Sequence, residues 1–140
     1  MKILFAADGS PFTKKALAFL VTHEGLSGPN DELIVLNVQP PVPPRVKTMV
    51  GAAAVADYHR EEAEKVIEPI KAFLGRHQVP FRCVWVIGPP ADEIVDHAQS
   101  EQAQMIVMGT RGYGLVGRFF MGSVAQRVVA QCDVPVLLVK

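Results

Sequence analysis

Residues 3–12, ILFAADGSPF, contain a short apolar run, a turn and the start of a helix. The apolar residues 3–7 indicate a buried strand. The turn that follows places Ser10 at a helix N-cap and Pro11 at the first helical position. Apolar side chains then recur at helical spacing as far as the glycine-containing stretch 25–28. The chain therefore opens with a strand followed by a helix.

The same order recurs along the rest of the chain. Short apolar, β-branched runs predict further strands at 32–38, 82–87, 105–108 and 134–139. Apolar residues at helical spacing predict further helices over 52–78, after residue 90 and after residue 122. Alternating strands and helices predict an α/β fold: a single doubly wound, Rossmann-like five-stranded parallel sheet with helices on both faces. With 140 residues, we expect one domain, 1–140, around one core.

Prolines mark two local features. The segment 39–44 holds four prolines, which predicts an extended surface connection. Pro69 lies inside the long helix expected over 52–78. Because proline lacks a backbone donor and clashes with the preceding turn, we expect a kink or break near residues 66–68. The inner face of that helix is expected to carry the following residues: Val55, Tyr58, Ala63, Val66, Ile67, Ile70, Phe73 and Leu74.

Composition excludes several classes of protein. The formal net charge is zero and the charges are scattered, which argues against nucleic acid as a partner. No apolar run approaches the roughly 20 residues of a membrane span, and no signal segment is evident, so we expect a cytoplasmic protein. The two cysteines have no metal-ligand spacing. Surface positions without metal ligation are expected for the four histidines, which are His23, His59, His77 and His97.

The stretch 109–123, GTRGYGLVGRFFMGS, carries five glycines. Glycine-rich backbone can turn successive N–H groups toward an anion, and the helix that opens at Gly122-Ser123 also favours negative charge at its start. Ser123 can add a hydroxyl donor, and Arg111 can reach a terminal phosphate or remain solvated. A mobile loop without a ligand is the alternative interpretation. Phosphate is the ligand that this pattern favours.

The position of Asp8 in the predicted fold indicates a role in ligand binding. In open α/β sheets, ligands bind at the carboxyl ends of the strands where neighbouring connections leave on opposite faces. If the strand order is 3-2-1-4-5, Asp8 and Gly109 lie on either side of one crevice. Asp8 could then accept hydrogen bonds from ribose hydroxyls or help to hold Mg²⁺. A simple turn residue that caps the helix remains the alternative.

The glycines and the serine of this loop, Gly109, Gly112, Gly122 and Ser123, form the pattern G-x2-G-x9-G-S. This pattern resembles the ATP-binding signature of the universal stress protein family. The opening strand with its Asp8-Gly-Ser turn, the segment 88–94 (GPPADEI), residues 107–109 (VMG) and residues 134–139 (VPVLLV) are also similar to that family. The resemblance covers essentially the whole chain and implies the strand order 3-2-1-4-5.

Carried over to this chain, the resemblance implies a site for ATP, with Mg²⁺. Asp8 would contact ribose, while the backbone of Ala7 and Val38 would flank the adenine and Met108 would border the same pocket. The phosphates would be surrounded by Gly109, Arg111, Gly112, Gly122, Ser123 and Val124. The last strand, residues 135–139 (Pro135 to Val139), resembles the family's dimer edge and implies a homodimer.

The function that follows is an ATP-binding stress-response regulator, a nucleotide-dependent switch with at most weak ATP hydrolysis. ATP occupancy would change the loop 110–121 or the dimer surface and so alter the binding of a protein partner. The chain has no Gly-Lys pair for a P-loop and only one glycine in the first turn, which argues against a P-loop ATPase and a dinucleotide dehydrogenase. Two alternatives remain: a nucleotide-transferring or ATP-cleaving enzyme on the same fold, and a dimeric interaction module with an empty nucleotide site.

Overall fold

The computed structural model describes residues 1–23, 25–26, 28–111 and 121–140. Its five strands form one parallel sheet in the order β3-β2-β1-β4-β5, so the predicted α/β fold and strand order are confirmed. The strands are β1 (Lys2–Ala6), β2 (Glu32–Gln39), β3 (Phe81–Ile87), β4 (Met105–Gly109) and β5 (Val136–Val139). The helices are α1 (Pro11–Thr22), α2 (Pro44–Val50), α3 (Ala52–Arg76), α4 (Pro90–Ser100) and α5 (Ser123–Gln131).

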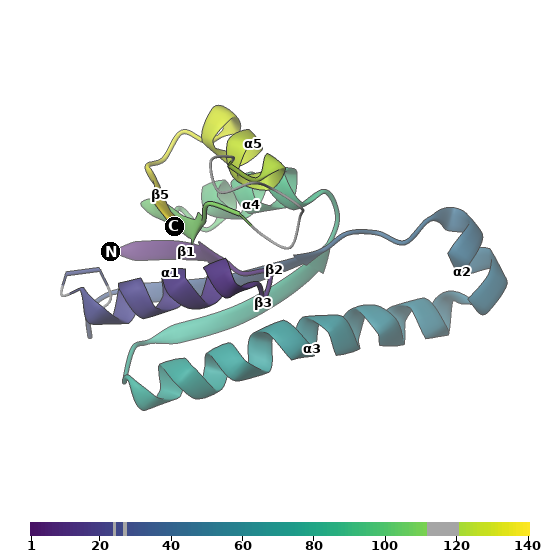
Figure 1. Ribbon diagram of the computed structural model, residues 1–140, viewed down its shortest axis with the longest axis horizontal. Coiled ribbons are helices and arrows are strands. Elements are labelled where there is room, and N and C mark those ends of the chain that lie inside the picture. Colours follow the sequence, from purple (N-terminus) through teal and green to yellow (C-terminus); the bar gives the residue numbers. More distant parts are fainter. Residues whose placement is uncertain (24, 27, 112–120) are drawn as a thin grey trace.

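Helices cover both faces of the sheet (Figure 1). Because successive side chains of a strand point to opposite faces, Ile3 and Phe5 of β1 pack with α1 and α3, whereas Leu4 and Ala6 pack with α4 and α5. All four side chains are buried. A central strand that is apolar on both faces is the pattern expected of a doubly wound parallel sheet.

The start of α1 follows the sequence expectation. Ser10 is the N-cap, with its hydroxyl accepting from the Thr13 N–H at 3.4 Å, and Pro11 occupies the first helical position. The first strand ends at Ala6, so the chain turns through Asp8 immediately before the helix. This short connection fixes Asp8 at the carboxyl edge of the sheet.

The long helix α3 passes through Pro69 without the predicted break. Proline in a helix interior costs about 3 kcal/mol. Full burial of a large aliphatic side chain recovers about 1.5–3 kcal/mol, and Ile67, Ile70 and Leu74 are all buried on one face of this helix. Ile70 and Leu74 pack in the core with residues of β1 and β2. Packing on both sides of Pro69 therefore outweighs its local penalty.

His59 corrects the expectation of a surface histidine, because only 1% of it is exposed. It lies four residues before Ala63 and eight before Ile67, so helical spacing places it on the buried stripe of α3. Tyr58, expected on the inner face, lies off that stripe and is 50% exposed. The expected positions of His59 and Tyr58 are thus exchanged.

The short helix α2 has no counterpart in the sequence expectations. All of its residues are exposed, so it lacks the amphipathic stripe from which a helix is recognised. It follows the extended segment 40–43 and, together with the first turns of α3, lies at the end of the molecule remote from the N-terminus (Figure 1). Of the predicted connection 39–44, residues 40–43 lie outside helices and strands, whereas Gln39 is the last residue of β2 and Pro44 begins α2, so the prediction was wrong at both ends.

Candidate functional site

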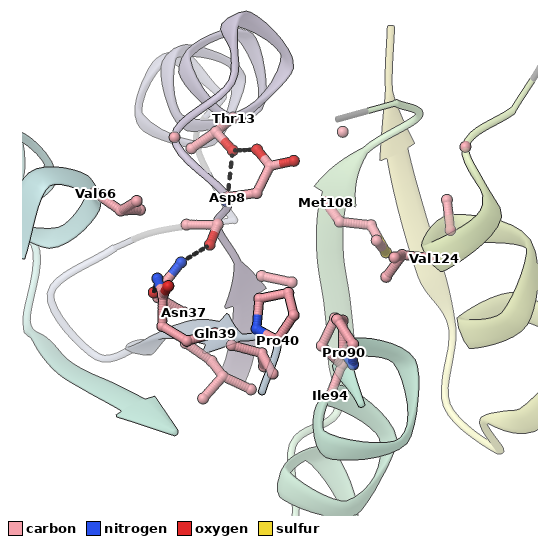
Figure 2. Close-up of a pocket in the computed structure, with 18 of the residues that line it drawn as sticks. Asp8, Thr13, Asn37, Gln39, Pro40, Val66, Pro90, Ile94, Met108 and Val124 are labelled. Carbon is pink, nitrogen blue, oxygen red and sulfur yellow. Dashed lines mark hydrogen bonds between the residues drawn. The ribbon is translucent and has the colours of Figure 1, made fainter. Parts of the chain in front are cut away.

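The loop after β1 holds Asp8 in a fixed orientation. Its Oδ1 accepts from the Ser10 N–H at 2.9 Å and from the Thr13 hydroxyl at 2.8 Å. The Thr13 oxygen in turn accepts from the Asp8 N–H at 3.0 Å. Figure 2 shows Oδ1 directed to Thr13 and the second carboxylate oxygen on the side away from it. Asp8 is therefore a turn residue through one oxygen, although Ser10 and not Asp8 is the helix N-cap, while the other oxygen faces away from the helix.

The end of β2 carries a buried polar pair. Asn37 donates through Nδ2 to the Ala7 carbonyl at 2.8 Å, and Gln39 donates through Nε2 to Asn37 Oδ1 at 2.7 Å. Both side chains are at least nine-tenths buried. Amides are kept in an apolar interior only when they are hydrogen-bonded, so this chain of bonds fixes the loop after β1 relative to the end of β2.

The third segment joins β4 to α5. The Gly122 N–H donates to the Thr110 carbonyl at 2.8 Å, which brings the start of α5 beside the end of β4. Gly122 is the N-cap and supplies no side-chain bond to the first turn. Ser123 and Val124 line the crevice, so the start of α5 brings its unpaired N–H groups and the positive end of the helix dipole to it. Such an arrangement favours an anion.

These segments enclose one cavity of about 580 Å³ at the carboxyl ends of β1, β2 and β4 (Figure 2). This volume falls in the range of small-molecule sites, about 300–1,000 Å³. The predicted site residues that line it are Ala7, Asp8, Val38, Met108, Gly109, Arg111, Gly122, Ser123 and Val124. The remaining predicted residue, Gly112, lies outside the described residues.

Sequence reasoning missed several lining residues. Asn37 and Gln39 were detectable in principle, since polar residues at the end of an otherwise apolar strand require a reason. Glu62, Lys65 and Val66 come from α3 and carry no local signal, because only the tertiary packing of that helix places them at the cavity. Lys65 Nζ lies 2.9 Å from Glu62 Oε1, an ion pair that raises the pKa of the lysine.

The described residues that line the cavity offer few metal ligands. Among the described residues, no group of three His, Cys, Asp or Glu side chains is close enough to hold an ion. Asp8 and Glu62 are the carboxylates among the lining residues that the structure describes. Mg²⁺ commonly keeps several waters and binds one or two carboxylates together with phosphates. The site therefore suits a cation that arrives with a phosphate ligand.

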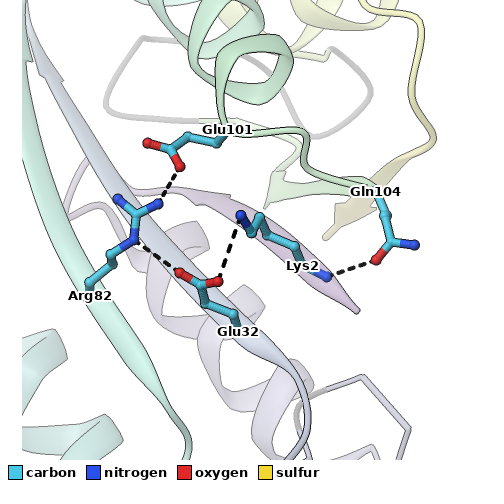
Figure 3. A network of polar contacts seen from close by, with 5 residues as sticks. All are labelled: Lys2, Glu32, Arg82, Glu101 and Gln104. Carbon is cyan, nitrogen blue, oxygen red and sulfur yellow. Dashed lines mark hydrogen bonds and ion pairs between the residues drawn. The ribbon is translucent and has the colours of Figure 1, made fainter.

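The opposite end of the sheet carries ion pairs that tie its strands together (Figure 3). Arg82 of β3 donates to Glu32 Oε1 at 3.0 Å and also to Glu101 after α4. The ammonium nitrogen of Lys2 in β1 lies 3.8 Å from Glu32 Oε2, and the backbone N–H of Lys2 donates to Gln104 Oε1 at 2.9 Å. The hydrogen bond from Arg82 holds the pKa of Glu101 below its ordinary value. This network links β1, β2, β3 and α4 and lies away from the cavity.

The fold and the cavity define a doubly wound α/β protein with a crevice at the point where the connections from the strands diverge. The model of the universal stress protein family matches residues 1–140, and the chain belongs to this family. No helix in the described parts of the chain is long and apolar enough to cross a membrane.

Individual relatives agree with this assignment. A universal stress protein from the QAH/OAS sulfhydrylase 3′ region of Thermus aquaticus is 39% identical over 99% of this chain and 97% of its own length. The structure of MJ0577 from Methanocaldococcus jannaschii has a TM-score of 0.85 at 29% identity, covering 99% of this chain and 94% of the other. The Archaeoglobus fulgidus universal stress protein, solved in complex with dAMP, has a TM-score of 0.68 at 24% identity, covering 100% and 98%.

Proposed function

We propose that this chain binds ATP, with Mg²⁺, in the cavity and acts as a nucleotide-dependent regulator in the stress response. The observation that carries the proposal is the convergence of three separate segments on one cavity. They are the loop after β1, the end of β2, and the connection from β4 to α5. Every predicted site residue that the structure describes lies in one of them, at the end of β4 or at the start of α5. A site for a base, a sugar and phosphates needs such different surfaces side by side.

The end of β2 offers an edge for adenine. The hydrogen bonds from Glu32 N–H to Met1 and from Ala7 N–H to Leu36 show that even-numbered residues of β2 face β1. Val38 has the same parity, so its N–H and carbonyl point to the side where β1 has already ended. In a continued ladder the Val38 N–H would bond to the Ala7 carbonyl, but the Asn37 side chain donates to that carbonyl instead. This leaves a backbone donor and acceptor that match the hydrogen-bonding edge of adenine.

Asp8 and the start of α5 suit the ribose and the phosphates. The second carboxylate oxygen of Asp8 can accept from ribose hydroxyls or contribute to Mg²⁺, while the bonds to Ser10 and Thr13 hold the group in place. The N–H groups at the start of α5, with the Ser123 hydroxyl, can bind phosphate oxygens. When bound, Mg²⁺ would neutralise part of the phosphate charge.

The site supports regulation better than efficient hydrolysis. The described lining residues include no histidine, and both of their carboxylates are engaged, Asp8 with Thr13 and Glu62 with Lys65. A general base must reach the attacking water and hold a suitable pKa. With neither carboxylate placed for that role, we expect at most weak ATP hydrolysis.

We also propose a homodimer through residues 135–139. Ile106 donates to the Pro135 carbonyl at 2.9 Å and Thr110 donates to Val139 at 3.0 Å, so odd-numbered residues of β5 face β4. Val136 and Leu138 therefore direct their backbone groups to the open edge of the sheet. Val136→Pro removes one outward donor, and sedimentation velocity should then show a shift toward monomer. Val136→Ala, which only shortens the side chain, should remain a dimer, and equal dissociation of both variants would argue against pairing through this edge.

The nucleotide proposal is tested by identifying what the purified protein carries. Mass spectrometry of material released by denaturation, followed by calorimetric titration of ATP and Mg²⁺ into the emptied protein, should detect an adenine nucleotide with one site per chain. Asp8→Ala should weaken ATP binding, whereas Asp57→Ala, an exposed carboxylate on α3 outside the cavity lining, should not. The absence of both released nucleotide and binding heat at several temperatures would contradict the proposal and favour an interaction module with an empty site.

A further inference from the structure

A second cavity, of about 430 Å³, lies between α1 and α3, and we call it the α1–α3 groove. Gly9, Thr13, Lys65 and Val66 line both this groove and the first cavity, so the two adjoin. The remaining residues of its described lining belong to α1 and α3 alone. Its volume lies within the range of small-molecule sites, about 300–1,000 Å³.

The apolar part of the groove is a stripe along α3. Val66, Pro69, Ile70 and Phe73 recur at the spacing of one helix face, and Leu17 of α1 completes the apolar lining. Leu17 and Ile70 are each 5% exposed, whereas Pro69 is open to solvent. From Val66 to Phe73 the helix advances by roughly 10 Å. An apolar surface of this length suits an alkyl chain.

The charged part of the groove is cationic. Lys14, Lys65 and Arg76 line it, and the described residues of the lining include no aspartate or glutamate. Lys65 is paired with Glu62 at 2.9 Å, which offsets its charge. Within the described chain, the Lys14 ammonium has no ion-pair partner. The lining therefore favours a ligand that combines an apolar body with a negative charge.

Lys14 and Arg76 lie toward different ends of the groove. Lys14 follows Thr13, which lines both cavities, so it belongs to the end next to the first cavity. Arg76 comes after Val66 by ten residues of the same helix, or roughly 15 Å along its axis. The Arg76 guanidinium carbon lies 5.9 Å from the centre of the Phe73 ring, at the far end of the apolar stripe.

We propose that the α1–α3 groove binds a fatty acid of medium length, with its carboxylate beside Lys14 and its alkyl chain along the apolar stripe toward Phe73. The Lys14 ammonium would donate a charge-assisted hydrogen bond to the carboxylate, and each methylene removed from water adds to the affinity. A ligand with a positive head would be repelled by the cationic lining. This site is separate from the proposed nucleotide site and does not depend on it.

The test is calorimetric titration of decanoate, below its micelle concentration, into the full-length protein. Decanoate should bind with one site per chain. Hexanoate, which lacks four of its methylenes, should bind at least about tenfold more weakly, because less apolar surface leaves water. Decanol, which has the same chain and a neutral head, should bind roughly two- to fivefold more weakly than decanoate, as expected for one exposed ion pair.

Two neighbouring lysines separate a specific contact from general surface charge. Lys14→Gln should weaken decanoate binding roughly two- to fivefold and leave decanol binding unchanged, whereas Lys14→Arg should retain the preference for decanoate. Lys15 is the matched control, since its ammonium lies 5.4 Å from the centre of the Phe12 ring and outside the groove lining. Lys15→Gln should bind decanoate as the wild type does. Equal losses in Lys14→Gln and Lys15→Gln would overturn the assignment of the carboxylate to Lys14.

Pro69 tests the apolar stripe, because it lines the groove but not the first cavity. Pro69→Glu would place a carboxylate beside the alkyl chain, and Pro69→Gln is a neutral side chain of the same shape. Both variants remove a proline from a helix interior, so both should fold. Pro69→Glu should bind decanoate at least about tenfold more weakly than Pro69→Gln. Equal affinities would overturn the proposal.

Other occupants of the groove would give different results. Decanoate binding that neither the Lys14 nor the Pro69 variants alter would place the fatty acid elsewhere, for example in the first cavity. Binding that weakens as the protein concentration rises would show that a second copy of the chain fills the groove. Binding of a synthetic acidic amphipathic peptide without binding of decanoate would assign it to a protein partner. Each of these outcomes overturns the proposal, and none of them bears on the titration of ATP.

Discussion

Gly109→Ala adds a single methyl group at the junction of β4, α1 and the cavity. The new Cβ would lie 2.5 Å from Phe12 Cβ and 3.1 Å from the Phe12 carbonyl carbon. Carbon atoms normally pack at about 3.5–4.0 Å, so α1 or the end of β4 must move by about 1 Å. Phe12 Cβ is attached directly to the backbone and cannot avoid the contact by changing rotamer. Gly109 is therefore required for space.

The expected cost follows from this crowding. Inserting a methyl group into a packed interior costs about 1–3 kcal/mol, and alanine returns about 0.4–1 kcal/mol by restricting the unfolded chain. We expect the free energy of unfolding to fall by about 0.5–2 kcal/mol. Urea denaturation followed by circular dichroism measures the change. ATP titration should show weaker binding, because the lining residues Asp8 and Arg111 lie next to α1 and β4 in the sequence and would move with them.

Gly75→Ala is the matched control. Gly75 lies within α3, and a Cβ placed there meets no described heavy atom within 4 Å. The same substitution should raise the free energy of unfolding by about 0.5–1 kcal/mol, because alanine is a better helix former than glycine. A Gly109→Ala protein as stable as the wild type, or two variants that change in the same direction, would refute this account of the packing.

The remaining predictions concern three other side chains. Thr13→Val keeps the shape of a buried residue but leaves the Asp8 N–H without its acceptor. Urea denaturation should show that the free energy of unfolding falls by about 1–3 kcal/mol, and calorimetry should show a weaker affinity for ATP. Unchanged values would contradict the role of the Asp8–Thr13 bonds. Arg82 lowers the pKa of Glu101, so the carboxylate stabilises the fold above the ordinary glutamate pKa of about 4.3, and this contribution is lost as the pH falls below that value. The free energy of unfolding of the wild type should therefore exceed that of Glu101→Gln at neutral pH, and the difference should shrink on acidification. A difference that does not depend on pH would be inconsistent with the ion pair. Burial raises the pKa of the Cys83 thiol, so iodoacetamide should modify it more slowly in the native protein than in urea near pH 8.5, and equal rates would show that the thiol is accessible.

The sheet could be predicted because its signals are local. Apolar runs such as 32–38 and 105–108 stand between helical patterns, and alternation of the two leaves few topologies. The order β3-β2-β1-β4-β5 came from the family resemblance, and the structure confirms it. The start of α1 was predicted to the residue because Ser10 and Pro11 have specific preferences at helix termini.

The errors arise where tertiary packing decides. Pro69 was expected to kink or break α3; the break does not occur, and burial of Ile67 and Ile70 beside the proline maintains the helix. His59 was treated by residue type, whereas its position on the stripe with Ala63 decides its burial. The exposed helix α2 gave no periodic signal at all.

The candidate site shows the same division. Asp8, Gly109 and Gly122 could be chosen from sequence, since each has an unusual residue type at the end of a strand or the start of a helix. Lys65 could not, because its place beside the cavity depends on how α3 crosses the sheet. Asn37 could be predicted only in part. A polar residue within the apolar strand β2 is visible in the sequence, but only the structure shows that its side chain bonds to the Ala7 carbonyl.

A crystal structure of the protein grown with ATP and Mg²⁺ tests the central claim most directly. The account predicts one nucleotide per chain in the cavity, with adenine against the backbone of Val38, ribose at Asp8 and phosphates at the start of α5 beside Ser123. A cavity that stays empty at millimolar ATP, or a nucleotide bound elsewhere on the molecule, would contradict it.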